Sequence, residues 1–183
     1  MPHTITCVEL HADDWARLRD IRLRALTDSP HAFGGTYEKE NLLDEQQWRL
    51  DFVKQTHIVA SVDGIDAAMM YIENLQGDFG ATCWIGGCWS DPNFRGVGLM
   101  RAMFEFIDKQ ATSRDWLVQG LGVWTDNNLA ISAYEKLGFV EMGGPQPSTR
   151  QPGKFYQRMI RKTIKRQFFI ESSSIRKRAF NMP

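Results

Sequence analysis

Alternating and helically spaced apolar residues divide the first half of the chain into short elements. Alternation over Thr4–Leu10 predicts a strand, and apolar positions at helical spacing after Asp13 or Asp14 predict a helix to about Leu26. Ser29-Pro30 should stop this helix, because the residue before a proline avoids helical backbone angles. The same reasoning predicts a loop over His31–Tyr37, a helix over Glu45–Lys54 capped by Asp44, and a hairpin of His57–Val62 and Ala67–Glu73 around Asp63-Gly64.

The second half continues as an alternation of strands and helices. Its clearest helical pattern covers Gly96–Thr112, where apolar residues recur on one face. Gly86-Gly87 inside a predicted strand indicates a bulge or a close approach of backbones. The order of the elements predicts an α/β fold, a mixed sheet with helices on both faces. The other elements we expect are strands over Thr82–Ser90, Leu117–Thr125, Val140–Met142 and Phe155–Lys162, a helix over Asn127–Leu137 ended by Gly138, and loops over Gln76–Gly80 and Gly143–Gly153.

Length and composition predict one globular domain. The chain has 183 residues, of which 43% are apolar and 24% charged, as in ordinary folded proteins. No apolar run reaches the roughly 18 residues that a membrane span needs, and the N-terminus lacks the pattern of a secretory signal. We therefore expect a cytoplasmic protein that does not bind membranes, with a domain over residues 1–162 and a basic C-terminal tail over 163–183.

Charge and cysteine usage narrow the function classes. Seven of the 22 basic residues but one of the 22 acidic residues lie from Arg161 onward, which leaves residues 1–160 with a net charge of −6. This balance weakly favours a cationic substrate and disfavours nucleic acid as the main partner. Three cysteines argue against a disulfide framework, and the spacing of Cys83 and Cys88 places them on opposite faces of one strand. With four scattered histidines, we expect no metal site.

The pattern of Asp91–Arg101 predicts the end of a strand, then a tight loop of arginine and glycine, then the start of a helix. The first N–H groups of a helix have no partner inside it, so this geometry favours a bound phosphate. A plain strand–helix turn would have the same pattern. The stretch is not a dinucleotide-binding fingerprint, because Arg101 occupies the position of the third glycine. It is not a Walker loop either, because the Gly-Lys-Ser/Thr ending is absent. The candidate donors are the N–H groups of Gly96, Val97, Gly98, Met100 and Arg101 and the side chains of Arg95 and Arg101.

A tyrosine lies in the middle of the next predicted helix. Tyr134 follows Asn127 by seven residues, so both project from one helix face. A phenol within hydrogen-bond reach can protonate a departing thiolate, whose conjugate acid has a pKa of about 8.5. The alternative is a core aromatic residue that packs with Ala130 and Leu137.

Together the two stretches resemble the GNAT superfamily of acetyl-CoA-dependent N-acetyltransferases. Its first motif, Pro-x-x-Arg-Gly-x-Gly-x-Gly/Ala, is matched up to its last position, where Met100 adds bulk. Its second motif, Asn-x-x-Ala-x-x-x-Tyr-x-x-x-Gly-Phe, is complete, and Leu26–Gly34 with Trp48 resembles an acceptor-side segment. The matching motif residues are Pro92, Arg95, Gly96 and Gly98, followed by Asn127, Ala130, Tyr134, Gly138 and Phe139.

The resemblance implies a GNAT-type fold, mostly antiparallel, in which Thr82–Ser90 splays from Leu117–Thr125 to leave a cleft. It implies acetyl-CoA as the acyl-donor co-substrate and no metal. It also implies site residues: the backbone of Cys88, Trp89 and Ser90 beside the pantetheine arm, Arg95, Gly96, Val97, Gly98, Met100 and Arg101 at the pyrophosphate, Asn127 at the cofactor arm, and Tyr134 as the general acid.

The acceptor side is less determined. An aliphatic amine must lose a proton before it attacks, and many relatives supply a Glu where Gly122 stands here. Glu73, Asp91 or an ordered water are the candidate bases. The resemblance places the acceptor pocket between Arg22–Tyr37 and the loop after Met142. The aromatic side chains of Trp84, Trp89 and Trp124 are candidates to line it; the alternative is that they pack in the core, as aromatic residues on strands more often do.

We therefore predict an N-acetyltransferase that acetylates a primary amine of a small molecule or peptide by direct attack in a ternary complex, as a monomer or homodimer. A non-catalytic module that senses or scaffolds acyl-CoA is the alternative, and Gly122 and Met100 favour it. A third possibility is nucleotide or nucleic-acid binding through the basic tail. The sequence does not name the amine.

Overall fold

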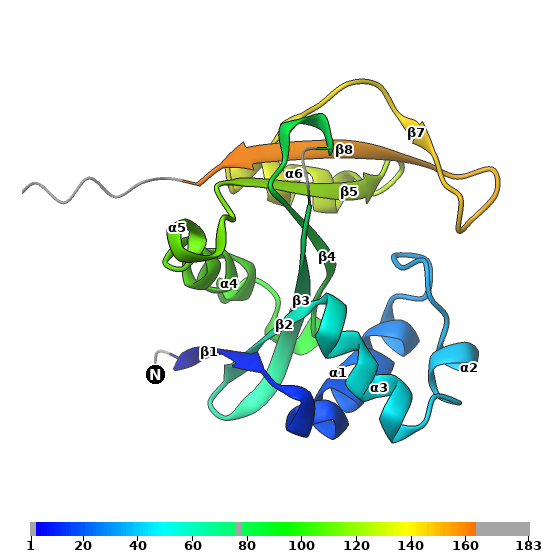
Figure 1. Cartoon of the computed structure of the whole chain (residues 1–183), viewed down its shortest axis with the longest axis vertical. Coiled ribbons are helices and arrows are strands. Elements are labelled where there is room, and N and C mark those ends of the chain that lie inside the picture. Colours follow the sequence, from blue (N-terminus) through cyan, green and yellow to red (C-terminus); the bar gives the residue numbers. More distant parts are fainter. Residues whose placement is uncertain (1–2, 76–77, 164–183) are drawn as a thin grey trace, which may run out of the picture.

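The computed structural model describes residues 3–75 and 78–163, which form one sheet with helices on both faces (Figure 1). The strand order is β1-β2-β3-β4-β5-β8-β6, with β7 paired to β8. The strands are β1 (Ile5–Leu10), β2 (Thr56–Val62), β3 (Ile65–Asn74), β4 (Cys83–Ser90), β5 (Val118–Trp124), β6 (Val140–Glu141), β7 (Gln146–Pro147) and β8 (Phe155–Lys162). The helices are α1 (Trp15–Asp28), α2 (Tyr37–Glu40), α3 (Glu45–Lys54), α4 (Leu99–Asp108), α5 (Ala111–Arg114) and α6 (Asn128–Lys136), with 3₁₀ turns at Ala12–Asp14, Asp78–Gly80 and Pro92–Phe94.

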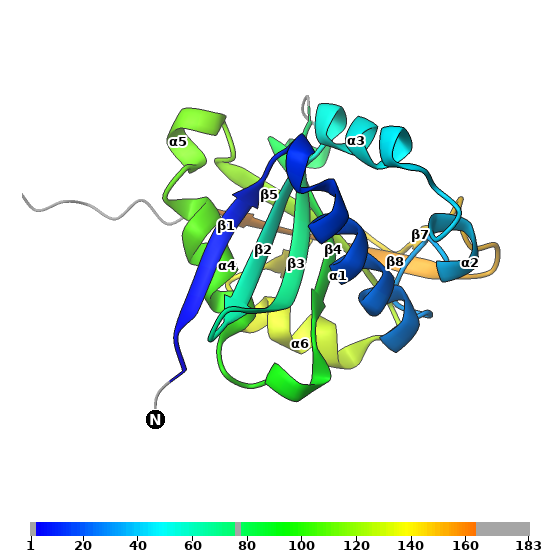
Figure 2. The same ribbon diagram turned by 90° about the horizontal axis from the view of Figure 1, so that it is seen from below.

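Each face of the sheet has its own apolar core. Helix α4 covers one face with Met103, Phe104 and Ile107, which follow the helical spacing expected from the sequence. Helices α1 and α3 cover the other face, where Leu18 and Trp48 are buried (Figure 2). The mixed sheet with helices on both faces is confirmed. Within residues 3–75 and 78–163, no helix combines the length and the apolar character that a membrane crossing requires.

The predicted helix over Gly96–Thr112 is too long at both ends. Gly98 has a φ of +96°, a left-handed angle that cannot lie inside an α-helix, so α4 begins at Leu99. The helix ends at Asp108, and α5 forms a separate turn. Helix α1 runs two residues past the predicted Leu26, and the short α2 lies just after the predicted loop.

A β-bulge in β4 corrects the prediction for the two cysteines. The register moves from Met69 opposite Trp89 to Tyr71 opposite Gly86, so β4 carries one extra residue at this point. Gly87 adopts a φ of +62° there. The extra residue reverses the alternation, and the side chains of Cys83 and Cys88 both pack on the α4 face of the sheet.

The parallel pair β4–β5 separates after a short ladder, as the GNAT-type fold implies. Pairing joins only Cys83–Ile85 to Gln119–Leu121. Beyond this point the bulge turns β4 away, while aromatic rings fill the space beside β5: a Cβ on Gly122 would lie 3.0 Å from the rings of Trp84 and Tyr156. The two strands therefore diverge toward their carboxyl ends.

One buried arginine joins four elements on the α4 side. The Arg161 guanidinium, on β8, donates to Asp108 at 2.6 Å, to Gln119 on β5 at 2.9 Å and to the carbonyl of Leu137, just after α6, at 3.1 Å. Its carbon lies 4.6 Å from the centre of the Phe104 ring. The side chain is 6% exposed. This group, the Arg161 cluster, fixes α4 and α6 to the sheet.

His57 is a second buried polar side chain on the opposite face. The residue is 4% exposed, and its ring packs edge-on against Phe52 with 4.9 Å between centroids. Neither ring nitrogen has a hydrogen-bond partner of good geometry among the described residues. Burial, helped by the positive charge of Arg22, lowers the pKa of His57 from 6.5 to about 4. The imidazole is therefore neutral at neutral pH.

This imidazole should make stability depend on pH. In the unfolded chain His57 binds a proton near pH 6.5, whereas in the folded chain it does so only near pH 4. The free energy of unfolding is therefore highest above pH 6.5 and falls as the pH is lowered from 6.5 toward 4. We expect the wild type to lose about 2 kcal/mol more unfolding free energy between about pH 7 and about pH 5 than His57→Phe. Urea denaturation of both proteins at the two pH values measures this difference, and equal losses would contradict it.

Candidate active site

The diverging ends of β4 and β5 open into a cavity of about 400 Å³, called here the main cavity. Its floor comes from the two strands, with Cys88 on one side and Gly122 on the other. Its walls come from the loop after α1 and the loop between β7 and β8, which face each other in Figure 1. Residues distant in sequence therefore line one cavity where β4 and β5 are no longer paired.

Tyr134 projects from α6 into this cavity. Its ring packs edge-on against Phe139 with 5.8 Å between centroids, which fixes the direction of the hydroxyl. Burial, and then the neighbouring thiol of Cys88, raises the pKa of Tyr134 well above its ordinary value of 10. Burial likewise raises the pKa of the Cys88 thiol to about 11, although its hydrogen bond with Tyr134 opposes this. The phenol therefore keeps its proton at neutral pH.

Asn127 lies at the start of α6 and also lines the main cavity. Its side-chain oxygen accepts a hydrogen bond of 3.2 Å from the N–H of Ala130, so the residue caps the helix. The spacing in the sequence predicts that Asn127 and Tyr134 share one helix face. The structure brings both side chains to the same cavity.

The Arg/Gly loop forms the start of α4. No described residue accepts a hydrogen bond from the N–H groups of residues 96–101. Gly96 and Gly98 have φ angles of +83° and +96°, and a Cβ on either would meet no atom within 4 Å. The glycines are therefore needed for their left-handed backbone. The result is a run of free donors at the positive end of a helix.

The side chain of Arg95 points from this loop toward α1. It donates to Asp28 at 3.0 Å and to the carbonyl of Ser90 at 3.2 Å. Asp28 also accepts from the indole of Trp89 at 2.9 Å. Burial would raise the pKa of Asp28, but the hydrogen bonds from Trp89, Ser29 and Arg95 outweigh it and lower the pKa. The loop is thereby tied to the end of α1.

The main cavity contains some of the predicted site residues. Those that line it are Cys88, Asn127 and Tyr134; those that do not are Trp89, Ser90, Arg95, Gly96, Val97, Gly98, Met100 and Arg101. The Trp89 side chain lies on the α1 face, so the expectation that it lines the acceptor pocket with Trp84 and Trp124 is wrong. The bulge in β4 turns it to that side.

The two candidate carboxylates lie in different places. Glu73 lines the main cavity and accepts a hydrogen bond from the side-chain amide of Gln55. Asp91 does not line it; this residue caps the 3₁₀ turn through the N–H of Asn93 and lies 3.3 Å from a guanidinium nitrogen of Arg24. Of the two candidate carboxylates, Glu73 is therefore the one that lines the main cavity. Among the described residues, no three His, Cys, Asp or Glu side chains are grouped to hold a metal ion.

Sequence reasoning missed three further polar residues of the main cavity, Tyr71, Arg150 and Tyr156. Tyr71 lies two residues before Glu73 on one strand, so strand alternation could have placed both on one face. Burial, and then the charge of Glu73, raises the pKa of Tyr71, against the opposing charges of Arg150 and Arg22. Arg150 lies in the loop after Met142, which the resemblance placed at the acceptor pocket, but no local pattern singles out this residue.

The comparisons with known proteins agree with this geometry. The sequence profile described as "Acetyltransferase (GNAT) family" matches residues 15–139. The chain belongs to the GNAT acetyltransferase family. The match covers both sequence motifs and most of the main cavity, and it ends before the loop that carries Arg150. A search of curated proteins finds no match.

Solved structures share the GNAT fold at low sequence identity. The GNAT acetyltransferase from Streptococcus pneumoniae has a TM-score of 0.69 and 17% identity, over 87% of this chain and 99% of that one. The ribosomal-protein-S18-alanine N-acetyltransferase from Escherichia coli has a TM-score of 0.62 and 21% identity, over 87% and 94%. The spermidine N-acetyltransferase from Vibrio cholerae, solved with CoA and spermine, has a TM-score of 0.64 and 13% identity, over 87% and 95%.

Proposed function

We propose that this protein transfers the acetyl group of acetyl-CoA to a primary amine by direct attack. The observation that carries the proposal is the Tyr134 hydroxyl, which keeps its proton inside the cavity between the diverging strands. Acetyl-CoA supplies an acetyl group activated as a thioester. When the amine nitrogen bonds to the acetyl carbon and the carbon–sulfur bond breaks, Tyr134 gives its proton to the departing sulfur, and the second proton that the nitrogen loses returns to the phenol through solvent.

The residues present fit the donor. Free N–H groups over residues 96–101 would hold the pyrophosphate, aided by the dipole of α4 and the side chain of Arg101. The backbone of Cys88, Trp89 and Ser90 would lie beside the pantetheine arm, and Asn127 would contact it. The CoA in the Vibrio cholerae spermidine N-acetyltransferase, which shares the fold, supports this choice of donor.

Glu73 is the proposed base. The amine arrives protonated, because its pKa is about 10.4, and must lose that proton before it attacks. The Glu73 carboxylate lines the main cavity and would take the proton directly or through one water. It would thus fill the role that Gly122, at the usual position on β5, cannot.

Acetyl-CoA titration and thiol release together test the proposal. Calorimetry measures whether acetyl-CoA binds, and a thiol reagent then follows release of CoA on addition of amines, among them peptides with a free N-terminus, amino acids and polyamines. Amine-dependent thiol release with matching amide product is the expected result. Binding without thiol release for every amine would instead favour the non-catalytic sensor or scaffold.

Gly98→Ala should weaken acetyl-CoA binding. Alanine at a φ of +96° is strained by roughly 1–2 kcal/mol, and relief of this strain moves the free N–H groups of the loop. We expect a loss in affinity of about 5- to 30-fold by calorimetry. Gly64→Ala is the matched control: Gly64 has a φ of +85°, its Cβ would meet nothing within 4 Å, and it lies in the β2–β3 turn. The control should lose similar stability and bind acetyl-CoA normally; equal affinities of the two variants would contradict a role for the loop.

A further inference from the structure

The charged side chains that line the main cavity are not all compensated. Arg22 forms two hydrogen bonds of 2.7 Å with the carboxylate of Glu40, and both side chains are mostly buried. This pair is electrically neutral and holds α1 to α2. Arg22 therefore has no free charge to offer to a ligand.

Two other charged side chains line the main cavity, those of Arg150 and Glu73. The Arg150 guanidinium makes no ion pair or hydrogen bond with any residue in 3–75 or 78–163. The Glu73 carboxylate has only the neutral amide of Gln55 as a partner among the same residues. Both line the main cavity, and the charge of each reaches the hydroxyl of Tyr71. The cavity thus presents one free cation and one free anion within its described walls.

The surroundings of Arg150 suit a carboxylate. Ser148 and Thr149 line the same wall, where Ser148 Oγ accepts hydrogen bonds from the N–H groups of Arg150 and Gln151, and the side chain of Arg150 lies against Gly34, where a Cβ would come within 2.7 Å of its Cδ. A guanidinium binds a carboxylate with two parallel hydrogen bonds, and neighbouring hydroxyls can add donors. The glycine at position 34 lets the arginine lie over the cavity mouth.

We infer that the acceptor is a zwitterion, an amine that also carries a carboxylate, as in a free amino acid. Its ammonium group would lie toward Glu73 and its carboxylate toward Arg150. The inference rests on the proposed acetyltransferase function and names the substrate class of that site. It differs from the cationic substrate that the overall charge of residues 1–160 favours, because the charges inside the cavity act at closer range than the charges over the surface.

A second cavity gives the rest of such a molecule a place. Its volume is about 350 Å³, and it shares five lining residues with the main cavity: Arg22, Gly34, Gly35, Tyr71 and Arg150. A molecule held by its two charged groups in the main cavity could extend its side chain past Tyr71. Asp51 and Gln55 are polar residues that line this second cavity.

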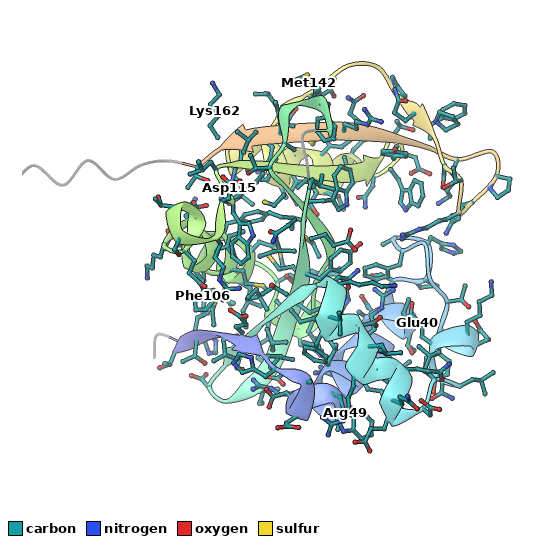
Figure 3. The ribbon with its side chains drawn as sticks, viewed as in Figure 1. Glu40, Arg49, Phe106, Asp115, Met142 and Lys162 are labelled. Carbon is teal, nitrogen blue, oxygen red and sulfur yellow. The ribbon has the colours of Figure 1, made fainter. Side chains whose placement is uncertain are left out.

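The test compares matched acceptors by thiol release. Each amino acid is paired with its amide and with the amine that lacks the carboxylate, and ω-amino acids vary the spacing of the two charges. We expect the carboxylate to raise kcat/KM by about 10- to 100-fold. Arg150→Gln should remove most of this preference through KM, so that the ratio of kcat/KM between each amino acid and its amide falls toward one. Lys162→Gln, which removes a cation at the far end of β8 (Figure 3), should behave as the wild type.

The outcomes separate this inference from the proposed function. Amides, simple amines or spermidine used as well as amino acids would overturn the inference and keep the acetyltransferase. A preference for amino acids that survives Arg150→Gln would overturn the role of Arg150. Acetyl-CoA binding without thiol release for every acceptor would overturn both the inference and the proposed function.

Discussion

Tyr134→Phe is expected to lower kcat by about 10²- to 10³-fold while the affinity for acetyl-CoA stays nearly the same. The ring remains packed against Phe139, so the variant loses only the hydroxyl that faces the cavity. Without that proton the sulfur must leave as an unprotonated thiolate, which raises the activation free energy of the transfer step. The free energy of acetyl-CoA binding does not depend on this proton, so the affinity stays the same. Steady-state thiol release measures kcat, and calorimetry measures the affinity.

The control for this prediction is Tyr37→Phe. Tyr37 lies on α2, outside both cavities, with 40% of its surface exposed. It should keep the wild-type kcat. A Tyr134→Phe variant with unchanged kcat on an accepted amine would remove the proposed acid. A fall in affinity that explains the whole loss of rate would instead assign the hydroxyl to binding.

Asp108→Ala is expected to lower the free energy of unfolding by about 3–5 kcal/mol. The change removes the only carboxylate in the Arg161 cluster and leaves a guanidinium that is 6% exposed without a counter-charge. Burial already lowers the pKa of Arg161, against the charge of Asp108. Urea denaturation at neutral pH measures the loss, and a change below about 1 kcal/mol would contradict it.

A double variant separates the two contributions to this loss. In Asp108→Leu with Arg161→Met, no buried charge remains, and apolar side chains fill the space beside Phe104. We expect this protein to be more stable than Asp108→Ala, because an unpaired buried charge costs more than a missing pair. Equal stability of the two would mean that the hydrogen bonds to Gln119 and Leu137 carry the effect.

Local patterns were enough to predict most of the fold. The apolar ladder of α4, the cap at Asp44 and the Asp63-Gly64 turn each depend on residues close in sequence, and each lies where expected. The motif of α6 is also local, so the seven-residue spacing of Asn127 and Tyr134 is enough to place them on one helix face. The prediction of the sheet followed from the order of these elements.

Other features depend on contacts that no local pattern contains. Gly86-Gly87 predicted the place of the β4 bulge, but only the register with Met69 and Tyr71 shows that the bulge adds one residue, so Cys83 and Cys88 were assigned to opposite faces. Arg150 and Glu73 are 77 positions apart in the sequence and line one cavity because the strand order β3-β4-β5-β8 brings their elements to the same part of the sheet. The sequence analysis grouped Arg161 with the basic residues near the C-terminal end, but the structure buries its side chain. The predicted tail lies, from residue 164 onward, outside the described part of the chain.

The bulge at Gly87 also limits how this chain can change its length. A surface loop can gain or lose a residue with little effect on its neighbours. Deletion of Gly87 would leave the residues on either side of the bulge opposite the same β3 partners and on the same faces, with Cys88 toward α4 and Trp89 toward α1, but β4 would lose the bend that the extra residue creates. A chain of this fold without the extra residue would therefore keep the same faces of β4 and would need another way to turn this strand away from β5.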